Sequence, residues 1–365
     1  MVPQFFPVLR ELRAVTGRSP LDLARDVLDA SRAHGVSAHD FANLMLWEIP
    51  KARWREYVVG EDLDAFLAKT LDPEDRLLSR DKAAFAELDR RKGLPWLPTL
   101  AVINRRDGIA IDGATAITSV EQLWAVLARL GQDGDEHREL VVKPSCGERG
   151  RGFFRLTPHG GIRDGAGADV DREVFAHAVL NYTHPLGNYG YLVQPAVKPH
   201  PDLVRITGID MLASVRVVTA LKDGTPHVVE SFLKIPGPGR LTDNFLSGAK
   251  GTTIARVDPA TGRLSDVVGL LRAGFRHALE RTSIHPATGR RIAGETLPSW
   301  REALDVAYRA ARAHPRTVAI GWDVAIGASG CVILDGNPNW GPGWEPCDAE
   351  GVRARLARLY PDDFR

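Results

Sequence analysis

The chain has 365 residues, of which 44% are hydrophobic, 25% charged and 7% aromatic. These fractions lie close to the averages of globular proteins, and they exclude a disordered, collagen-like or coiled-coil chain. The 47 Lys and Arg residues nearly balance the 46 Asp and Glu residues, so the net charge of +1 gives no electrostatic basis for binding a nucleic acid or an anionic membrane.

The cysteines and the N-terminus indicate a cellular location. Cys146, Cys331 and Cys347 are odd in number and lack the spacing of a disulfide framework or a CxxC metal site, which is typical of a reducing compartment. The opening residues MVPQFFPVLRELR show no basic region followed by a long apolar core, so no signal peptide is predicted. The most apolar stretch, residues 318–334, contains an aspartate and several glycines, and is not expected to cross a bilayer. We expect a cytoplasmic protein without nucleic-acid or membrane partners, and the sequence leaves the oligomeric state open.

Residues 1–80 have the pattern of a helical region. Ser19 and Pro20 are typical of an N-cap and a first helical residue, and Gly35 is typical of a helix end. The apolar residues between them predict one buried face, made of Leu21, Ala24, Val27 and Leu28. Further helices are expected at residues 38–47, 61–69 and 81–92.

The pattern changes after Pro98, where a strand-rich lobe with two helices is expected. Short β-rich runs predict strands at residues 99–103, 108–111, 139–144, 152–156 and 191–197. Helices are predicted at residues 119–130 and 171–180, the first of them opened by a capping box of Ser119 and Gln122.

A second lobe is expected from residue 196 onwards. Strands are predicted at residues 211–221, 227–235, 252–257, 317–326 and 331–337, the first two joined by an Asp-Gly hairpin turn. Helices are predicted at residues 267–279, 300–314 and 349–359. The sequence thus predicts an α+β protein with a helical region at 1–80, a first lobe at 81–195 and a second lobe at 196–365.

The segment KPSCGERGRG, residues 143–152, is a candidate phosphate-binding loop. Lys143 ends a predicted buried strand and supplies a positive charge, while Gly147, Gly150 and Gly152 let backbone N–H groups converge on phosphate oxygens. It is not a Walker A loop, because no Gly-Lys-Ser/Thr follows and the next element is predicted to be a strand. The alternative is a plain turn between two strands.

Two acidic residues and an amide form a candidate metal site. Asp323, Asp335 and Asn337 lie on two strands that a short turn joins, so their side chains can share one face. Carboxylate and amide oxygens are hard ligands that suit Mg²⁺ when it also contacts substrate phosphates. The alternative is that these residues only occupy strand edges or turns.

Two basic residues interrupt otherwise apolar strands. Arg216 lies within ASVRVV and Lys234 within SFLKI. A buried cation without a partner costs several kcal/mol, so each must pair with a carboxylate or face an anionic ligand. The sequence alone leaves both possibilities open.

Taken in chain order, the segments resemble the ATP-grasp superfamily and, within it, the sugar-transfer-associated branch. The resemblance covers about residues 81–342 and is carried by DKAAFAELDRRKGLPWLPTL, VVKPSCGERGRGFF, YLVQPAV, SVRVVT, LTDNFLSGAKGTTI, GWDVAI and ILDGNPNWGPG. It implies an ATP-grasp fold in which two lobes clamp ATP. Two features depart from the pattern: position 335 is Asp where most relatives carry Glu, and a helical region replaces the usual α/β domain at the start.

The resemblance also implies roles for individual residues. ATP is expected at Lys82, Lys143, Gly147, Gly150, Val193, Gln194 and Val197, with the two lysines on the α- and β-phosphates and the last three in a hinge strand beside the adenine. One or two Mg²⁺ ions are expected on Asp323, Asp335 and Asn337. Arg216 is expected to stabilise the transferred phosphoryl group, with Lys234 and Asn244 in the same pocket.

The family's reaction predicts an ATP-dependent carboxylate–amine ligase. Such an enzyme forms an acyl phosphate and then an amide, and releases ADP and phosphate from small-molecule, sugar-acid or peptide-like carboxylate and amine substrates. One alternative is a kinase that phosphorylates a small-molecule hydroxyl with His227, Asp210 or Asp243 as the base. A second alternative is a nucleotide-binding scaffold without turnover.

Overall fold

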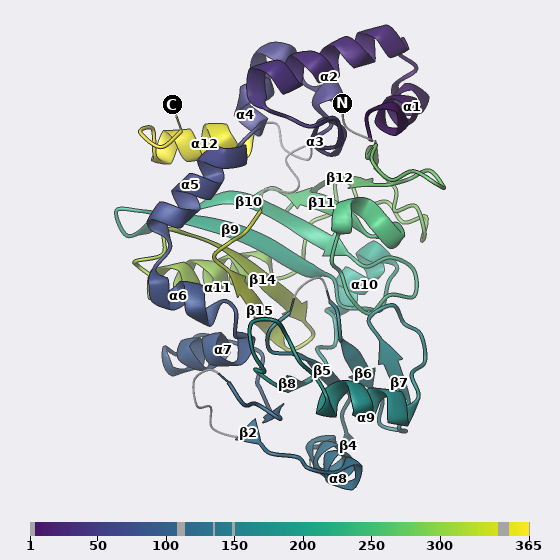
Figure 1. Ribbon diagram of the computed structural model, residues 1–365, viewed down its shortest axis with the longest axis vertical. Helices are drawn as coiled ribbons and strands as arrows, with labels where there is room; N and C mark the ends of the chain where they lie inside the picture. The colour runs from purple at the N-terminus through teal and green to yellow at the C-terminus, as the bar shows by residue number, and fades with distance from the viewer. Residues whose placement is uncertain (1–3, 108–113, 134–135, 148–149, 342–349, 365) are drawn as a thin grey trace.

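The architecture consists of two large β-sheets with helices on their faces (Figure 1). The computed structural model describes residues 4–107, 114–133, 136–147, 150–341 and 350–364. The first sheet has the order β2 (Ala114–Thr115), β1 (Ala101–Ile103), β8 (Tyr191–Pro195), β5 (Leu140–Pro144), β6 (Phe154–Leu156) and β7 (Ile162–Asp164). The second has the order β13 (Glu280–Thr282), β12 (Leu264–Gly269), β11 (Thr253–Val257), β10 (Thr225–Ile235), β9 (Ser214–Lys222), β14 (Ala319–Gly327) and β15 (Gly330–Asn337). A small ribbon pairs β3 (Gln132–Asp133) with β4 (Glu136–His137).

The helices fall into an N-terminal group and a group interspersed with the strands. The N-terminal group consists of α1 (Phe5–Thr16), α2 (Pro20–His34), α3 (Ala38–Asn43), α4 (Trp54–Tyr57), α5 (Gly60–Thr70), α6 (Pro73–Leu78) and α7 (Lys82–Arg91). The others are α8 (Val120–Leu130), α9 (Arg172–Leu180), α10 (Pro201–Thr207), α11 (Trp300–Ala313) and α12 (Val352–Leu359). None of the helices described has both the length and the apolar character needed to span a membrane.

Helices α8 and α9 cover one face of the first sheet. Leu123 and Leu127 of α8 and Phe175 of α9 are buried against strand residues such as Val142 and Val193. The predicted cap of α8 is present, since the Ser119 hydroxyl accepts a hydrogen bond from the backbone N–H of Gln122 at 3.3 Å. Strand β8 lies between β1 and β5, so its backbone is paired on both sides.

Helix α11 covers one face of the second sheet. Its apolar side, which includes Trp300, Ala303 and Val306, packs against β9, β10, β14 and β15. Helix α7 joins the same core through Phe85, whose ring lies 6.4 Å from that of Trp322. The sheet therefore holds α7 in place, and with it the side chain of Lys82 at the start of that helix.

The first four helices form a separate apolar cluster at the end of the second sheet that is remote from the first sheet (Figure 1). Helices α5 and α12 cover another part of the second sheet through Phe66 and Leu356. The buried carboxylate of Glu11 in α1 accepts hydrogen bonds from the backbone N–H groups of Arg276, His277 and Ala278, at 2.8–3.1 Å. This contact ties the N-terminal helices to the loop between β12 and β13.

Helix α2 begins and ends as expected, but its buried face matches the predicted one only in part, through Val27 and the half-buried Ala24. Ser19 caps it and Gly35 ends it with a φ of 69°. The side buried against the neighbouring helices carries Leu23, Val27 and Ala30, whereas Leu21 is 80% exposed and Leu28 42% exposed. Both sets have helical spacing, and only the position of the neighbouring helices decides which set is buried.

The helix predicted at residues 267–279 is wrong. Val267 and Val268 belong to β12, and the chain continues as turns up to β13. The run VVGLLRAGFRHAL contains Gly269 and Gly274, the latter with a φ of 82°, which weaken a helix. The backbone donors of residues 276–278 bind Glu11 instead of an earlier helical turn. The strand expected at residues 108–111 lies outside the described residues.

The expected α+β class is confirmed, with a helical region that precedes two sheet-based lobes. The boundaries predicted for the helical region (1–80), the first lobe (81–195) and the second lobe (196–365) remain a prediction. Helix α7 packs with the core of the second sheet although its sequence directly precedes the first lobe.

Candidate functional site

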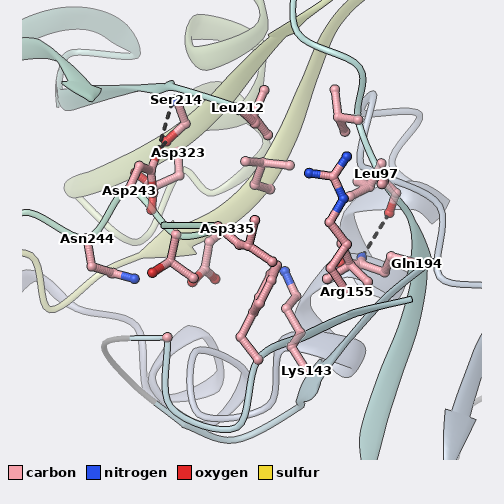
Figure 2. Close-up of a pocket in the computed structure, with 18 of the residues that line it drawn as sticks. Leu97, Lys143, Arg155, Gln194, Leu212, Ser214, Asp243, Asn244, Asp323 and Asp335 are labelled. Atoms are coloured by element: carbon pink, nitrogen blue, oxygen red, sulfur yellow. Dashed lines mark hydrogen bonds between the residues drawn. The ribbon is translucent and has the colours of Figure 1, made fainter. Parts of the chain in front are cut away.

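A cavity of about 300 Å³ lies between the two sheets. Lys143 of β5 and Gln194 of β8 line it from the first sheet (Figure 2). The second sheet contributes neighbouring strands, with Lys234 on β10, Arg216 on β9, Asp323 on β14, and Asp335 and Asn337 on β15. Twelve of the thirteen residues predicted for catalysis, ATP or metal line this cavity: Lys82, Lys143, Gly147, Gly150, Gln194, Val197, Arg216, Lys234, Asn244, Asp323, Asp335 and Asn337.

Of the thirteen side chains predicted for the site, Val193 is thus the one that the cavity lining leaves out.

Val193 lies in the core of the first sheet. Its side chain is fully buried, and its carbonyl oxygen accepts a hydrogen bond from the N–H of Leu100 at 2.8 Å. Because β8 is an interior strand, the backbone of Val193 faces the neighbouring strands β1 and β5, and the residue does not line the cavity. The residues that follow it, Pro195, Ala196 and Val197, line the cavity instead.

The acidic residues lie opposite each other on the β14–β15 hairpin. Asp323 and Asp335 are register partners, and directly paired residues of an antiparallel ladder point to the same face. A bulge follows Asp323. Asn337 donates from its amide nitrogen to the carbonyl oxygen of Gly321 at 3.3 Å and to Asp323 at 3.5 Å, which turns its amide oxygen away from these two groups.

The carboxylate of Asp323 is paired with two cations. Arg216 forms a two-pronged contact with it, at 2.7 Å through Nε and 3.0 Å through a terminal nitrogen, and Lys234 Nζ lies 2.9 Å from Oδ1. Burial of Asp323 would raise its pKa, but the charges of Arg216 and Lys234 outweigh burial and hold the pKa well below its usual range. The two basic strand residues are therefore satisfied by a carboxylate of the same sheet.

The second carboxylate is paired with the lysine at the start of α7. Lys82 Nζ lies 2.6 Å from Asp335 Oδ2. Burial would lower the pKa of Lys82, but the attraction of Asp335 dominates and raises it. The position of Lys82 is fixed by its neighbour Asp81, which caps α7 and accepts a hydrogen bond from the Ser145 hydroxyl at 2.7 Å. Residue Asp81 thus joins α7 to the beginning of the glycine-rich segment.

Lys143 has no comparable partner. Among the residues described, no side chain forms a hydrogen bond or ion pair with its ammonium group, although it lines the same cavity as Lys82 and Asp335. Burial lowers the pKa of Lys143 to about 8, and the nearby charge of Lys82 adds to this effect against the attraction of Asp335. A desolvated cation that faces a cavity without a counterion is a site for an anionic ligand.

The glycine-rich segment approaches the second lobe. A Cβ atom on Gly150, whose φ is 69°, would lie 3.0 Å from the amide nitrogen of Asn244 and 3.1 Å from a methyl group of Thr242. Glycine therefore permits this close approach of the two lobes. Positions 148 and 149, between the two glycines that line the cavity, lie outside the described residues.

The end of the cavity near β8 is lined by apolar side chains together with Gln194 and with Arg155 of β6. Gln194 is 2% exposed, and its nitrogen donates to the carbonyl oxygen of Leu97 at 3.3 Å (Figure 2). Its side-chain oxygen is buried and has no hydrogen-bond partner among the residues described. This oxygen can accept a hydrogen bond from a ligand that enters between the lobes.

Sequence reasoning missed the apolar and basic residues that complete the cavity. They are Leu97, Val141, Phe153, Arg155, Met211, Leu212, Leu241, Thr242 and Leu334. Two of them had a usable signal: Val141 lies two residues before Lys143 on β5 and so shares its face, and Arg155 is the register partner of Val141. The others come from loops or from the neighbouring lobe, and strand periodicity does not reveal them.

The donor set also bears on metal binding. No group of three or more His, Cys, Asp or Glu side chains within the described part of the chain is arranged to hold a metal ion. The chemistry of the site nevertheless fits Mg²⁺, because two carboxylates and an amide oxygen face one cavity and Mg²⁺ takes its other ligands from phosphates and water. The fit requires Lys82 to leave Asp335, and a phosphate group would give it a new partner.

Comparison with known proteins identifies a family. The model of the sugar-transfer associated ATP-grasp family matches residues 64–359. No curated protein sequence matches the chain. Among solved structures with a similar fold, D-cycloserine synthetase is 16% identical with a TM-score of 0.43, and the match covers 93% of each chain.

Two further structures are similar over a smaller share of their length. D-alanyl-alanine synthetase A from Vibrio cholerae is 12% identical with a TM-score of 0.39, over 77% of this chain and 60% of that one. The biotin carboxylase domain of 2-oxoglutarate carboxylase from Hydrogenobacter thermophilus is 14% identical with a TM-score of 0.34, over 72% of this chain and 40% of that one. The chain thus spans less than two thirds of the length of these two proteins.

Proposed function

The chain belongs to the sugar-transfer-associated ATP-grasp family, and on that premise we propose that it is an ATP-dependent ligase that joins a carboxylate to an amine. The observation that carries the proposal is the cavity between the lobes, where the unpaired Lys143 lies close to the Lys82–Asp335 ion pair. One end of the cavity has basic groups, a glycine-rich segment and oxygen ligands, which suit the triphosphate of ATP. The other end has mainly apolar side chains with Gln194 and Arg155, which suit the adenine.

The adenine end of the nucleotide is proposed to lie beside β8. The apolar side chains of Leu97, Met211 and Leu334 would sandwich the base, and the free oxygen of Gln194 would accept a hydrogen bond from its amino group. Backbone contacts are assigned to the segment from Gln194 to Val197. Val193 has no part in this arrangement, because its side chain and backbone belong to the sheet.

The triphosphate is proposed to lie toward β15. Lys143 would bind it directly, and Lys82 would exchange its contact with Asp335 for one with a phosphate oxygen. Backbone groups near Gly147 and Gly150 would bind the outer phosphates. Asp323, Asp335 and Asn337 would hold Mg²⁺, which when bound would supply positive charge beside the phosphates.

The chemistry that this arrangement supports is positioning and charge neutralisation. A carboxylate oxygen of the acid attacks the γ-phosphorus of ATP, the bond between that phosphorus and the bridging oxygen of the leaving ADP breaks, and an acyl phosphate forms. An amine then attacks the acyl carbon, the bond from that carbon to the phosphate oxygen breaks, and phosphate leaves with the electron pair and takes up the proton that the nitrogen loses, which gives the amide. Arg216 and Lys234, fixed by Asp323, would face the charge that develops on the transferred phosphoryl group, and Asn244 would donate a hydrogen bond there.

The proposal is tested with ATP, Mg²⁺, hydroxylamine and a mixture of carboxylic acids. Hydroxylamine captures an acyl phosphate as a hydroxamate, so a hydroxamate formed in step with ADP is the expected result. Release of AMP and pyrophosphate would contradict an acyl-phosphate route. The Lys143→Met variant is the matched control, because it removes the unpaired ammonium group and should abolish both products.

The kinase alternative is distinguished by the mass of the product. Three bases were considered for a kinase. His227 is exposed on β10 and does not line the cavity. Asp243 accepts a hydrogen bond from the N–H of Ser214 at 2.9 Å and lies 3.6 Å from Lys234. Asp210 lines the cavity and is exposed. A phosphorylated alcohol without condensation, lost in Asp210→Asn, would decide for the kinase. Nucleotide binding without any ADP release would decide for a scaffold.

A further inference from the structure

A second cavity, of about 800 Å³, lies next to the first. It is lined by the segment between α6 and α7, the glycine-rich segment, the loop before β8 and the residues that follow β15. The two cavities share five residues: Lys82, Pro144, Gly147, Arg151 and Asn337. The helices α1–α5 contribute no residue to the lining of either cavity, so within the described chain both are built by the two lobes and the segment that precedes α7.

The shared residues show which ends of the cavities meet. Lys82 and Asn337 belong to the end of the first cavity where we propose that the triphosphate lies. Gln194 and Val197, at the proposed adenine end, line the first cavity only. A molecule in the second cavity could therefore present a reacting group to the γ-phosphate, and this step of the reasoning rests on the proposed function.

The charge of the second cavity differs from that of the first. Four aspartates line the first cavity, whereas the described lining of the second contains Arg80, Lys82 and Arg151 and no Asp or Glu. Lys82 is engaged by Asp335. The side chains of Arg80 and Arg151 are exposed and form no hydrogen bond or ion pair within the described residues. Two guanidinium groups on one cavity without a carboxylate favour an anionic occupant.

The wall between the two arginines is neutral. The hydroxyl group of Tyr182 donates a hydrogen bond to the carbonyl oxygen of Cys146. The thiol of Cys146 lies 3.5 Å from Nδ1 of His184, which also accepts the N–H of Leu186 at 3.2 Å. Because Nδ1 accepts, the neutral ring carries its proton on Nε2 and can donate from there. These groups give hydrogen bonds and apolar surface but no negative charge that would neutralise the arginines.

We propose that the second cavity binds the acid substrate, and that this acid carries a second anionic group, a carboxylate or a phosphate, which Arg80 and Arg151 bind. The reacting carboxylate of the acid lies at the junction near Lys82 and Asn337. A carboxylate that only reacts would need no charge beyond those that already surround the phosphates, so the two additional arginines are explained by the second anion. The volume is sufficient for an acid of several carbon atoms.

The test measures binding by isothermal titration calorimetry on the full chain. The protein is first titrated with ADP and Mg²⁺, and the loaded protein is then titrated with succinate, glutarate and adipate, with phosphoglycolate, and with the matched monoanions butyrate, valerate, hexanoate and glycolate. At least one dianion should bind about tenfold or more tightly than its matched monoanion, the ratio that one charge-assisted contact supplies. The dicarboxylates and phosphoglycolate distinguish a second carboxylate from a phosphate.

Four variants locate the effect. Arg80→Ala and Arg151→Ala should each weaken binding of the preferred dianion about tenfold. Arg80→Ala should leave binding of ADP with Mg²⁺ unchanged. Arg76→Ala, an exposed residue of α6 that lines neither cavity, should change neither. Arg80→Lys should retain part of the preference, because it keeps the charge but not the planar donor pair.

The outcomes separate this inference from the proposed function. Failure of ADP and Mg²⁺ to bind would reject the nucleotide site itself. If the nucleotide binds, three results would overturn the inference and leave the proposed function standing. They are equal or tighter binding of the monoanions, no binding of any dianion, and a dianion preference that persists in both Arg80→Ala and Arg151→Ala.

Discussion

His314 provides a prediction whose size follows from the structure. The residue comes directly after α11, and its side chain is 1% exposed. Nδ1 lies 2.9 Å from a carboxylate oxygen of Asp75 in α6, and Nε2 lies 2.7 Å from one of Asp89 in α7. Because carboxylates only accept, both ring nitrogens must donate, and the imidazole carries a positive charge. This contact fastens α6 and α7, and so Lys82, to the second lobe.

The charge on His314 makes stability depend on pH. Burial would lower its pKa, but the hydrogen bonds to Asp75 and Asp89 dominate and raise it from 6.5 to about 9. The folded protein therefore binds a proton that the unfolded chain releases above pH 6.5. The resulting stabilisation is fully present below pH 6.5 and is lost as the pH rises through about 9, and a shift of this size corresponds to about 3 kcal/mol.

The assay is urea unfolding of the wild type and of His314→Gln between about pH 7 and pH 10, followed by tryptophan fluorescence. Trp322, whose ring lies 5.8 Å from that of His314, reports on the site. The variant should be less stable at pH 7, and the difference should shrink by about 3 kcal/mol toward pH 10. Lys143, whose pKa burial lowers to about 8, titrates in the same window but is common to both proteins and cancels. A difference that stays constant over this range would refute the charged state of His314.

Three further predictions concern the site and the lobe that carries it. Burial lowers the pKa of Lys143 to about 8, so ATP affinity measured by calorimetry should fall as the pH rises above 8, and Lys143→Arg should keep its affinity up to about pH 10 because arginine stays charged. Asp335→Asn should bind metal-free ATP more tightly, because Lys82 loses its partner, and should lose most of the gain that Mg²⁺ gives the wild type; an unchanged Mg²⁺ effect would contradict the ligand assignment. Gly190→Ala should lower the free energy of unfolding in urea by about 1–3 kcal/mol or more, because the φ of Gly190 is 75° and a Cβ would lie 2.4 Å from the carbonyl oxygen of Ile103. Gly224→Ala is the matched control, with the same φ and no atom within 4 Å of the added Cβ, and should lower the free energy of unfolding less.

Four residues of the site could be singled out from strand patterning alone, without the family resemblance. Arg216 and Lys234 are conspicuous because charges within apolar strands demand partners, and Asp323 and Asp335 because a hairpin brings them face to face. The sequence could not say that these charges pair with one another. That outcome depends on the strand order β10-β9-β14-β15, which places the basic strands directly beside the acidic hairpin.

Other failures have the same origin in tertiary structure. The prediction that Val193 contacts the adenine rests on the resemblance of YLVQPAV to a hinge strand and stays a prediction, whereas the interior position of β8, which places this residue in the core of the first sheet, follows from the tertiary structure. The run after Val267 has helical spacing, but Glu11, distant in sequence, satisfies the backbone donors of that loop. The cap of α2 at Ser19, by contrast, was predictable because it depends only on neighbouring residues.

The ion pairs that fill the clamp have a consequence for ligand selectivity. Lys82 is held by Asp335, and Asp323 by Arg216 and Lys234, so the groups suited to a polyanion are neutralised by the groups suited to a divalent cation. A polyanion that arrives alone leaves carboxylates uncompensated, and a cation that arrives alone leaves ammonium groups uncompensated. The polyanion and the divalent cation should therefore bind with positive cooperativity, each raising the affinity of the site for the other by the same factor. The site should bind metal-free nucleotide and free divalent ions more weakly than the complex of the two.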